Sequence, residues 1–223
     1  MALDANENYE LTAREKIVEV AKRLYARNLL AAADGNVSVR LSDDRIMITP
    51  SGRAKADLSP EEMAVMNLSG EVIIGQPSSE RLLHLEVYRR CPKAKAVVHA
   101  HPPTAIAWSL AHPHLGELPS EALPEVILAA GRIPIVPYAR PSTPQMASVL
   151  EPFLPHTRLM ILSRHGGLGW GESLEEAAMA LERLEHVAQI LMSAQVLGGA
   201  KPLDAAEVTA LREMRAKMGE RIL

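Results

Sequence analysis

The sequence predicts an α/β sandwich built on a largely antiparallel sheet. Two pairs of short apolar segments, 36–41 with 45–49 and 65–68 with 71–75, flank small polar turns, which is typical of β-hairpins. Segments with apolar residues at helical spacing precede and follow these pairs. Hairpins and helices occur together without a linker or an internal repeat, so we expect one domain over residues 1–223.

Helix signals open the chain and surround the second hairpin. Thr12 begins a capping box that predicts a first helix over roughly 12–28. Pro60 follows a serine and suits the first position of a short helix. The residues Pro-Ser-Ser-Glu at 77–80 then predict the start of a helix that Pro92 ends.

The second half of the chain adds further strands and helices. Residues 95–101 form a strand, and the Pro-Pro pair after it begins the next helix. The remaining predicted elements are a helix near 121–130, an edge strand at 133–138, a helix from Ser142, a strand at 158–163 that enters a glycine-rich turn, a long helix over 173–197 and a last helix over 203–220.

Composition and charge argue against several classes of partner. The net charge is −3 and no block of lysine or arginine occurs, which argues against nucleic-acid binding. The longest apolar runs reach only about ten residues, too few to span a bilayer. The N-terminus is polar and acidic, unlike a signal or transit peptide, and the single Cys91 cannot form an internal disulfide. We therefore expect a cytoplasmic protein that does not bind membranes.

The segment VVHAHPP, residues 97–103, places two histidines in an apolar strand. Side chains two residues apart on a strand share one face, so His99 and His101 converge. Two neutral imidazoles placed in this way can chelate a divalent metal, and a catalytic zinc needs about three protein ligands. The pair could equally be core histidines satisfied by hydrogen bonds. His165, at the end of a predicted strand, is the candidate third ligand or else a turn histidine held by its neighbours.

The other histidines lack this arrangement. His112 and His114 have the same spacing, but they lie in a Pro/Gly loop without a strand to direct them. His84, His156 and His186 have no partner at metal-ligand spacing, and we expect them to be structural or exposed.

Glu80 follows Ser78 and Ser79 at a predicted helix start. It could simply complement the helix dipole, or it could lie beside the metal and ligate it or move a proton. The two serines can cap the helix or bind phosphate. Two further turns, Gly35-Asn36 and 49–52, are small and rich in donors, as turns that wrap an anion are.

Taken in order, the segments DGNVSVRL, ITPSG, QPSSE, AVVHAHPP and LSRHGGLGWG resemble the class II aldolase/adducin family, the group of L-fuculose-1-phosphate aldolase and L-ribulose-5-phosphate 4-epimerase. The resemblance implies a three-layer α/β/α fold around a mixed, mostly antiparallel sheet. It implies one zinc ion per chain, which Mn²⁺ or Co²⁺ could replace, a phosphorylated sugar as substrate, and a homotetramer with active sites at subunit interfaces. The residues that it implies are His99, His101 and His165 as metal ligands, Glu80 as the catalytic carboxylate, and Asn36, Ser51, Gly52, Ser78 and Ser79 as phosphate contacts.

The chain departs from the fuculose-phosphate enzyme at three places. Ala33 stands where that enzyme has a hydroxyl in its phosphate loop. Pro124-Glu125 occupies the region of a catalytic tyrosine, and the tail after Gly199 contains no tyrosine. Glu125 is therefore a candidate for the second proton donor.

The resemblance implies that the protein cleaves a ketose phosphate to dihydroxyacetone phosphate and an aldehyde, through an enediolate that the metal stabilises. The same site supports decarboxylation, dehydration or epimerisation of a related sugar phosphate or of a hydroxy or keto acid, and these reactions are the alternative. A non-catalytic, adducin-like interaction domain is a third possibility. The three histidines and Glu80 argue against it, because a scaffold does not need them.

Overall fold

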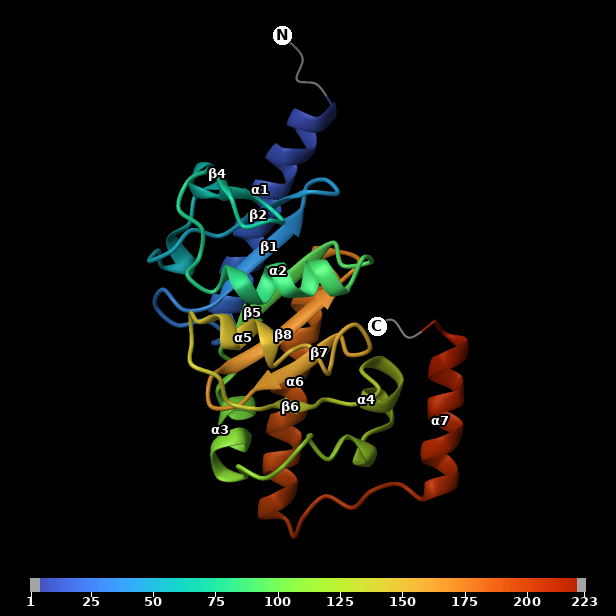
Figure 1. Cartoon of the computed structure of the whole chain (residues 1–223). Helices are drawn as coiled ribbons and strands as arrows, with labels where there is room; N and C mark the ends of the chain where they lie inside the picture. The colour runs from blue at the N-terminus through green and yellow to red at the C-terminus, as the bar shows by residue number, and fades with distance from the viewer. Residues whose placement is uncertain (1–4, 220–223) are drawn as a thin grey trace.

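Eight strands between residues 5 and 219, the part of the chain that the computed structural model describes, form one sheet (Figure 1). Their order is β4-β3-β2-β1-β5-β8-β7-β6, and all neighbouring pairs are antiparallel except β6 with β7. The predicted mixed, mostly antiparallel sheet is confirmed. The strands are β1 (Asn36–Arg40), β2 (Arg45–Ile48), β3 (Ala64–Asn67), β4 (Val72–Ile74), β5 (Ala96–Ala100), β6 (Ile135–Val136), β7 (Leu159–Leu162) and β8 (Gly166–Gly171).

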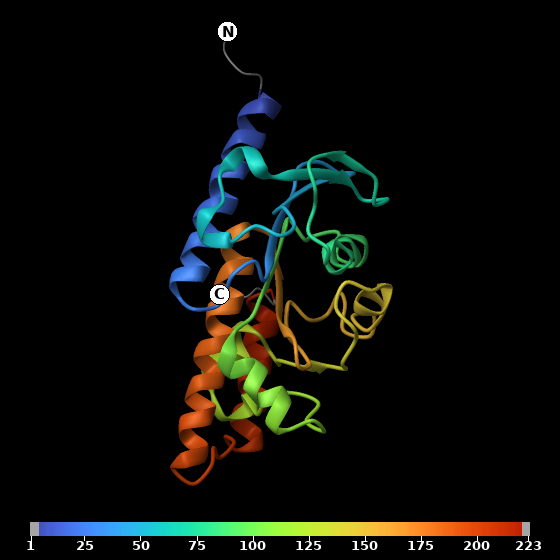
Figure 2. The same ribbon diagram turned by 90° about the vertical axis from the view of Figure 1, so that its left-hand side faces the viewer.

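Helices cover both faces of the sheet and complete three layers (Figure 2). α1 and α6 lie on one face, and α2 and α5 lie on the other. α3 packs against α6, and α4 packs against α7. Within residues 5–219, no helix is both long and apolar enough to cross a membrane. The helices are α1 (Ala5–Ala26), α2 (Arg81–Arg90), α3 (Pro103–Ala111), α4 (Pro124–Ala129), α5 (Pro144–Ser148), α6 (Leu174–Val196) and α7 (Ala205–Lys217), with 3₁₀ turns at Lys55–Asp57, Pro60–Glu62 and Ser120–Ala122.

Strand β5 shows how alternating side chains divide the two faces of the sheet. Ala96, Val98 and Ala100 belong to the core cluster that includes α1 and α6, whereas Val97 belongs to the cluster that includes α2. His99 shares the face of Val97, because side chains two apart on a strand point the same way. β5 lies in the interior of the sheet between β1 and β8, so both neighbours fix its backbone. A histidine on this strand therefore has a well-defined direction.

The first helix begins earlier than the capping box predicts. α1 starts at Ala5, and the Thr12 hydroxyl donates to the carbonyl of Asn8 at 2.9 Å. Thr12 thus makes a hydrogen bond inside the helix, one turn back, and does not cap its end. At α6 the predicted cap is confirmed, because the backbone N–H of Glu176 donates to Ser173 Oγ at 3.1 Å.

The glycine-rich segment after His165 is a strand, so the predicted turn at this place is wrong. β8 pairs with β5 along its length, and all six of its residues are buried. Glycine within a strand often marks the close approach of another backbone, and here that backbone is α6. A Cβ atom at Gly169 would lie 2.5 Å from Leu181 Cδ2 and 3.0 Å from the carbonyl oxygen of Ala177.

The broad apolar surface of α6 is largely covered within the chain. Ala177, Leu181, Leu184 and Ala188 are fully buried, and α6 contacts β8, β5, α3 and α1. Exposed apolar side chains remain toward the C-terminal end of the helix, at Ile190, Met192 and Val196. Packing inside one chain therefore accounts for most of the apolar character of α6.

Gly169→Ala should lower the free energy of unfolding by about 1–3 kcal/mol, because its new methyl group would press on the backbone of α6. Gly116→Ala is the matched control, since Gly116 has a negative or extended φ and no atom within 4 Å of the added Cβ. Urea unfolding followed by circular dichroism measures both. Equal stability of the two variants would contradict the close packing of β8 against α6.

Candidate metal centre

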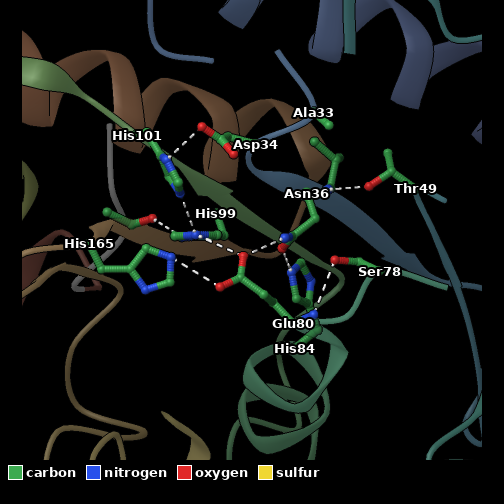
Figure 3. A network of polar contacts seen from close by, with 12 residues as sticks. Ala33, Asp34, Asn36, Thr49, Ser78, Glu80, His84, His99, His101 and His165 are labelled. Atoms are coloured by element: carbon green, nitrogen blue, oxygen red, sulfur yellow. Dashed lines mark hydrogen bonds and ion pairs between the residues drawn. The ribbon is translucent and has the colours of Figure 1, made fainter. Parts of the chain in front are cut away.

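Four residues from separate parts of the chain converge beside the interior of the sheet (Figure 3). His99 lies on β5, and His101 follows the end of that strand. His165 lies in the turn between β7 and β8, and Glu80 immediately precedes α2. One ligand atom from each side chain lies within 4.8 Å of those from the other three. The structure thus brings together all three predicted histidines and the predicted carboxylate.

The distances within this cluster fit a single divalent metal. His99 Nε2 lies 3.1 Å from His101 Nε2 and 3.3 Å from Glu80 Oε2, and His165 Nε2 lies 3.0 Å from Glu80 Oε1. Ligands about 2.0–2.1 Å from a tetrahedral zinc are separated by roughly 3.3 Å. Three imidazole nitrogens with one carboxylate oxygen are also a donor set that zinc prefers. The residues present therefore fit the metal that the family resemblance implies.

Hydrogen bonds behind the cluster orient two of the imidazoles. His99 Nδ1 donates to the carbonyl oxygen of Gly167 at 2.8 Å, which leaves the lone pair of Nε2 free for a metal. His101 Nδ1 faces the carboxylate of Asp34 at 3.5 Å, so the same tautomer is favoured there. Burial, with the nearby His99 and His165, lowers the pKa of His101 to about 3. His101 is therefore neutral at physiological pH, which is the form that ligates metals.

Glu80 is a largely buried carboxylate whose ionised form is stabilised by its neighbours. Burial favours protonation, but hydrogen bonds and charge from His165 and His99 outweigh it and hold the pKa of Glu80 well below its usual range. The side-chain amide of Asn36 donates to Glu80 Oε2 at 3.1 Å. The predicted phosphate contact Asn36 thus has its amide turned to the carboxylate (Figure 3).

A buried polar chain continues from Asn36 away from the cluster, and sequence reasoning missed it. His84 Nε2 is hydrogen-bonded to Asn36 Oδ1, and its Nδ1 lies 2.6 Å from Ser38 Oγ. Ser38 Oγ lies 2.9 Å from the hydroxyl of Tyr88. Burial and the neighbouring His99 lower the pKa of His84 to about 3. His84 is thus a buried structural histidine that fixes Asn36, whereas His156 and His186 are exposed.

The predicted polar loops and the metal cluster line one cavity of about 560 Å³. Its walls contain all five predicted phosphate contacts, namely Asn36, Ser51, Gly52, Ser78 and Ser79, together with Glu80, His101 and His165. A larger hollow of about 780 Å³ lies between α1 and the start of α6, but none of these residues lines it. The smaller cavity is the candidate site because it contains the titratable cluster.

Backbone contacts hold the loops of the cavity together. Pro50 and Pro77 form an isolated antiparallel bridge, which brings the two donor-rich loops side by side. The N–H of Ser51 donates to Gln76 at 3.0 Å, and the N–H of Ser78 donates to Thr49 at 3.2 Å. The N–H groups and hydroxyls of these loops are the kind of donors that bind a phosphate.

Lys55 also lines the cavity, and sequence reasoning did not single it out. Lys55 as a whole is 1% exposed, and Nζ donates to the carbonyl oxygens of Ala33 and Arg53, each at 2.8 Å. Burial lowers the pKa of Lys55, against the opposing charges of Asp34 and Glu80. Lys55 therefore ties the loop before β1 to the loop after β2. The sequence around Lys55 contains no pattern that predicts a lysine joining two loops.

Glu125, the candidate second proton donor, does not line this cavity. It lies at the start of α4 and borders a different hollow, beside Arg183 and His186 on α6. Within one chain, Glu125 is therefore outside the cavity that contains the metal cluster.

The double variant His99→Ala/His101→Ala should lose most bound metal, because it removes two of the three imidazole ligands. Protein purified without chelator should contain close to one divalent ion per chain, measured by inductively coupled plasma mass spectrometry. His112→Ala/His114→Ala is the matched control, since this exposed pair has the same spacing. Full metal retention by the first variant, or equal loss by both variants, would contradict the site.

Comparison with known proteins places these observations in a family. Residues 15–192 match the family model of the Class II Aldolase and Adducin N-terminal domain. The 3-oxo-tetronate 4-phosphate decarboxylase of Escherichia coli K12 is 34% identical over 211 residues, which cover 91% of this chain and 96% of that protein. The L-fuculose phosphate aldolase of Methanococcus vannielii is 32% identical over 176 residues, or 79% of this chain and 93% of that protein.

A solved structure agrees with both the fold and the sequence match. The crystal structure of YgbL from Escherichia coli superposes with a TM-score of 0.84 at 32% identity, and the match covers 92% of this chain and 99% of that one. The predicted α/β/α architecture is confirmed by this likeness. The chain therefore belongs to the class II aldolase/adducin family.

Proposed function

We propose that this protein is a metal-dependent decarboxylase of a 3-oxo-tetronate 4-phosphate, a four-carbon 3-oxo sugar acid phosphorylated on C4. The observation that carries the proposal is the layout of the cavity, in which donor-rich loops adjoin a three-histidine centre with one carboxylate, Glu80. The similarity to the E. coli decarboxylase, which extends over nine-tenths of this chain, supports the acid substrate. Decarboxylation, one of the alternative reactions that the sequence suggested, is thus preferred to aldol cleavage.

The loops and the cluster have separate roles in this reaction. Ser51, Gly52, Ser78 and Ser79 bind the phosphate of the substrate through hydroxyl and backbone N–H groups. His99, His101 and His165 would hold a divalent metal, which would supply Lewis-acid stabilisation of negative charge on substrate oxygens. The phosphate contacts position the substrate, so that its C2 and C3 lie beside Glu80.

The chemical step needs only one proton. The bond between C1 and C2 breaks, carbon dioxide leaves, and the electron pair passes to C2 and the C3 oxygen. Glu80 then delivers one proton, drawn from solvent, to C2, which gives dihydroxyacetone phosphate. Asn36, held by His84, keeps the Glu80 carboxylate directed at the reacting carbon.

Decarboxylation suits the proton-transfer groups of this cavity better than aldol cleavage does. Aldol cleavage needs a second group to take the proton from the hydroxyl that becomes the aldehyde. Among the described residues that line the cavity, the acids are Glu80 and Asp34, and Asp34 faces His101 Nδ1. Carbon dioxide leaves without a proton, so Glu80 suffices. Aldol cleavage remains the second candidate because of the similarity to the M. vannielii aldolase.

Zinc is the proposed metal, and a homotetramer is the proposed assembly. The nitrogen-rich donor set supports zinc over magnesium or calcium, which prefer oxygen ligands. The apolar side chains exposed near the end of α6, Ile190, Met192 and Val196, support a contact between subunits.

The zinc-loaded protein should convert 3-oxo-tetronate 4-phosphate to carbon dioxide and dihydroxyacetone phosphate, with kcat/KM at least roughly tenfold above that for L-fuculose 1-phosphate. Because both reactions give dihydroxyacetone phosphate, one coupled assay compares the two substrates directly. Carbon dioxide release, measured in parallel, identifies the decarboxylation. Efficient cleavage of the ketose phosphate without release of carbon dioxide from the acid would refute the proposal.

Glu80→Gln should keep the fold but lower kcat by roughly 10²–10⁴-fold, because an amide preserves the shape and cannot transfer a proton. Glu213→Gln on α7 is the matched control, since Glu213 is exposed and lies outside the cavity. Metal content is measured for both variants, so that loss of the ion is not mistaken for loss of proton transfer. A metal-loaded Glu80→Gln variant within a factor of about two of the wild type would exclude Glu80 as the proton carrier.

A further inference from the structure

Arg164 directly precedes the candidate metal ligand His165 and lines the same cavity. Its side chain is exposed, and the guanidinium group makes no hydrogen bond or ion pair with any residue in the described range 5–219. Lys55 and Arg164 are the two lysine or arginine residues among the described residues that line this cavity. Unlike Arg164, Lys55 is already bound to two carbonyl oxygens.

The backbone of Arg164 is held in a conformation that arginine rarely adopts. Its φ is +62°, in the left-handed region that favours glycine. The N–H of Arg164 donates to Ser109 Oγ at 2.8 Å, and this fully buried hydroxyl itself donates to the Ile106 carbonyl on α3 at 2.8 Å. Such strained residues cluster at functional sites, where surrounding contacts hold them. The buried Ser109 hydroxyl thus fixes the backbone of Arg164, whereas the guanidinium group makes no bond to the described residues.

The charged and polar groups of the cavity follow a definite order. Figure 3 shows Ala33, Thr49 and Ser78, which mark the donor-rich loops, on one side of the cluster and His165 on the opposite side. Lys55 is bonded to the loop that contains Ala33. Arg164 directly precedes His165 in the turn between β7 and β8, so the two cations come from different loops of the cavity.

A substrate with an anionic group at each end matches this order. Two lining carboxylates, Glu80 and Asp34, offset the two cations, so a bound divalent metal gives the cavity a net positive charge. A 3-oxo sugar acid 4-phosphate carries phosphate on C4, metal-binding oxygens on C3 and C2, and a carboxylate on C1. Phosphate at the loops and the C2–C3 oxygens at the cluster direct C1 toward the side of Arg164. A ketose phosphate has no charge to place there.

We propose that Arg164 binds the carboxylate of the substrate and selects sugar-acid phosphates over neutral-ended sugar phosphates. The planar guanidinium can form two parallel hydrogen bonds to a carboxylate. This inference rests on the proposed function, which identifies the substrate as a sugar-acid phosphate. Binding of the substrate carboxylate by Arg164 can be measured without turnover.

The chemistry also predicts which kinetic constant depends on Arg164. The carboxylate loses its charge as it becomes carbon dioxide, so its bond to Arg164 is stronger in the bound substrate than in the transition state. Removing the guanidinium should therefore raise KM without lowering kcat. A purely structural role for Arg164 would lower kcat or the metal content instead.

The test compares binding of two non-reacting ligands to the zinc-loaded protein by titration calorimetry. Erythronate 4-phosphate carries the terminal carboxylate, and erythritol 4-phosphate has a hydroxymethyl group in its place. The wild type should bind the acid more tightly by roughly tenfold or more, as expected for a charged hydrogen-bonded pair. Arg164→Gln should remove this preference, and Arg164→Lys should retain part of it. Arg132→Gln, at an exposed arginine outside the cavity, should leave it unchanged.

Arg164→Gly serves as a second variant, because glycine suits the left-handed backbone and also removes the guanidinium. It should bind erythritol 4-phosphate as the wild type does and should lose the preference for the acid. An unchanged preference in both Arg164→Gln and Arg164→Gly would overturn the inference. A wild type that shows the preference but releases no carbon dioxide would refute the proposed reaction and leave carboxylate recognition intact.

Discussion

The pairing of the glycine-rich strand β8 with β5 is the constraint on which the rest of the structure depends. Because β8 lacks side chains toward α6, the long helix can lie directly against the sheet. The same pairing brings the carbonyl of Gly167 to His99 Nδ1, which fixes the tautomer of that imidazole. It also places the turn that contains His165 opposite the end of β5. A Cβ at Gly166 would lie 2.8 Å from His99 Cε1, so this approach needs glycine. The pairing of β8 with β5 thus determines both how α6 packs on the sheet and how His99 and His165 are placed.

Burial of Glu80 is the main electrostatic cost of the site, since an unpaired carboxylate in a dry environment is strongly destabilising. The structure offsets it with His165, His99 and the amide of Asn36. His84 in turn holds Asn36, and its low pKa keeps it neutral. A divalent metal would add a stronger compensating charge at the same place. The polar chain from Glu80 to Tyr88 therefore stabilises one orientation of the carboxylate with or without the ion.

Local sequence patterns predicted the parts of the site that depend on local geometry. His99 and His101 could be paired because strand periodicity is local, and the hairpins and the cap of α6 follow from turn and capping chemistry. The strand character of β8 could not be predicted, because its glycines make sense only beside α6. The roles of Lys55 and Asp34 were also missed, since they come from contacts between loops. His84 was expected to be structural or exposed and is structural, but its bond to Asn36 could not be predicted because it joins α2 to β1. The start of α1 differs because Thr12 bonds back to Asn8.

We infer that one divalent metal binds between His99, His101, His165 and Glu80. Anomalous diffraction from crystals of the metal-loaded protein, collected above and below the absorption edge of the ion, tests it most directly. We expect one strong peak per chain, about 2.0–2.1 Å from the Nε2 atoms of all three histidines. A peak at another set of side chains, or a fully loaded protein with no peak between these histidines, would contradict it.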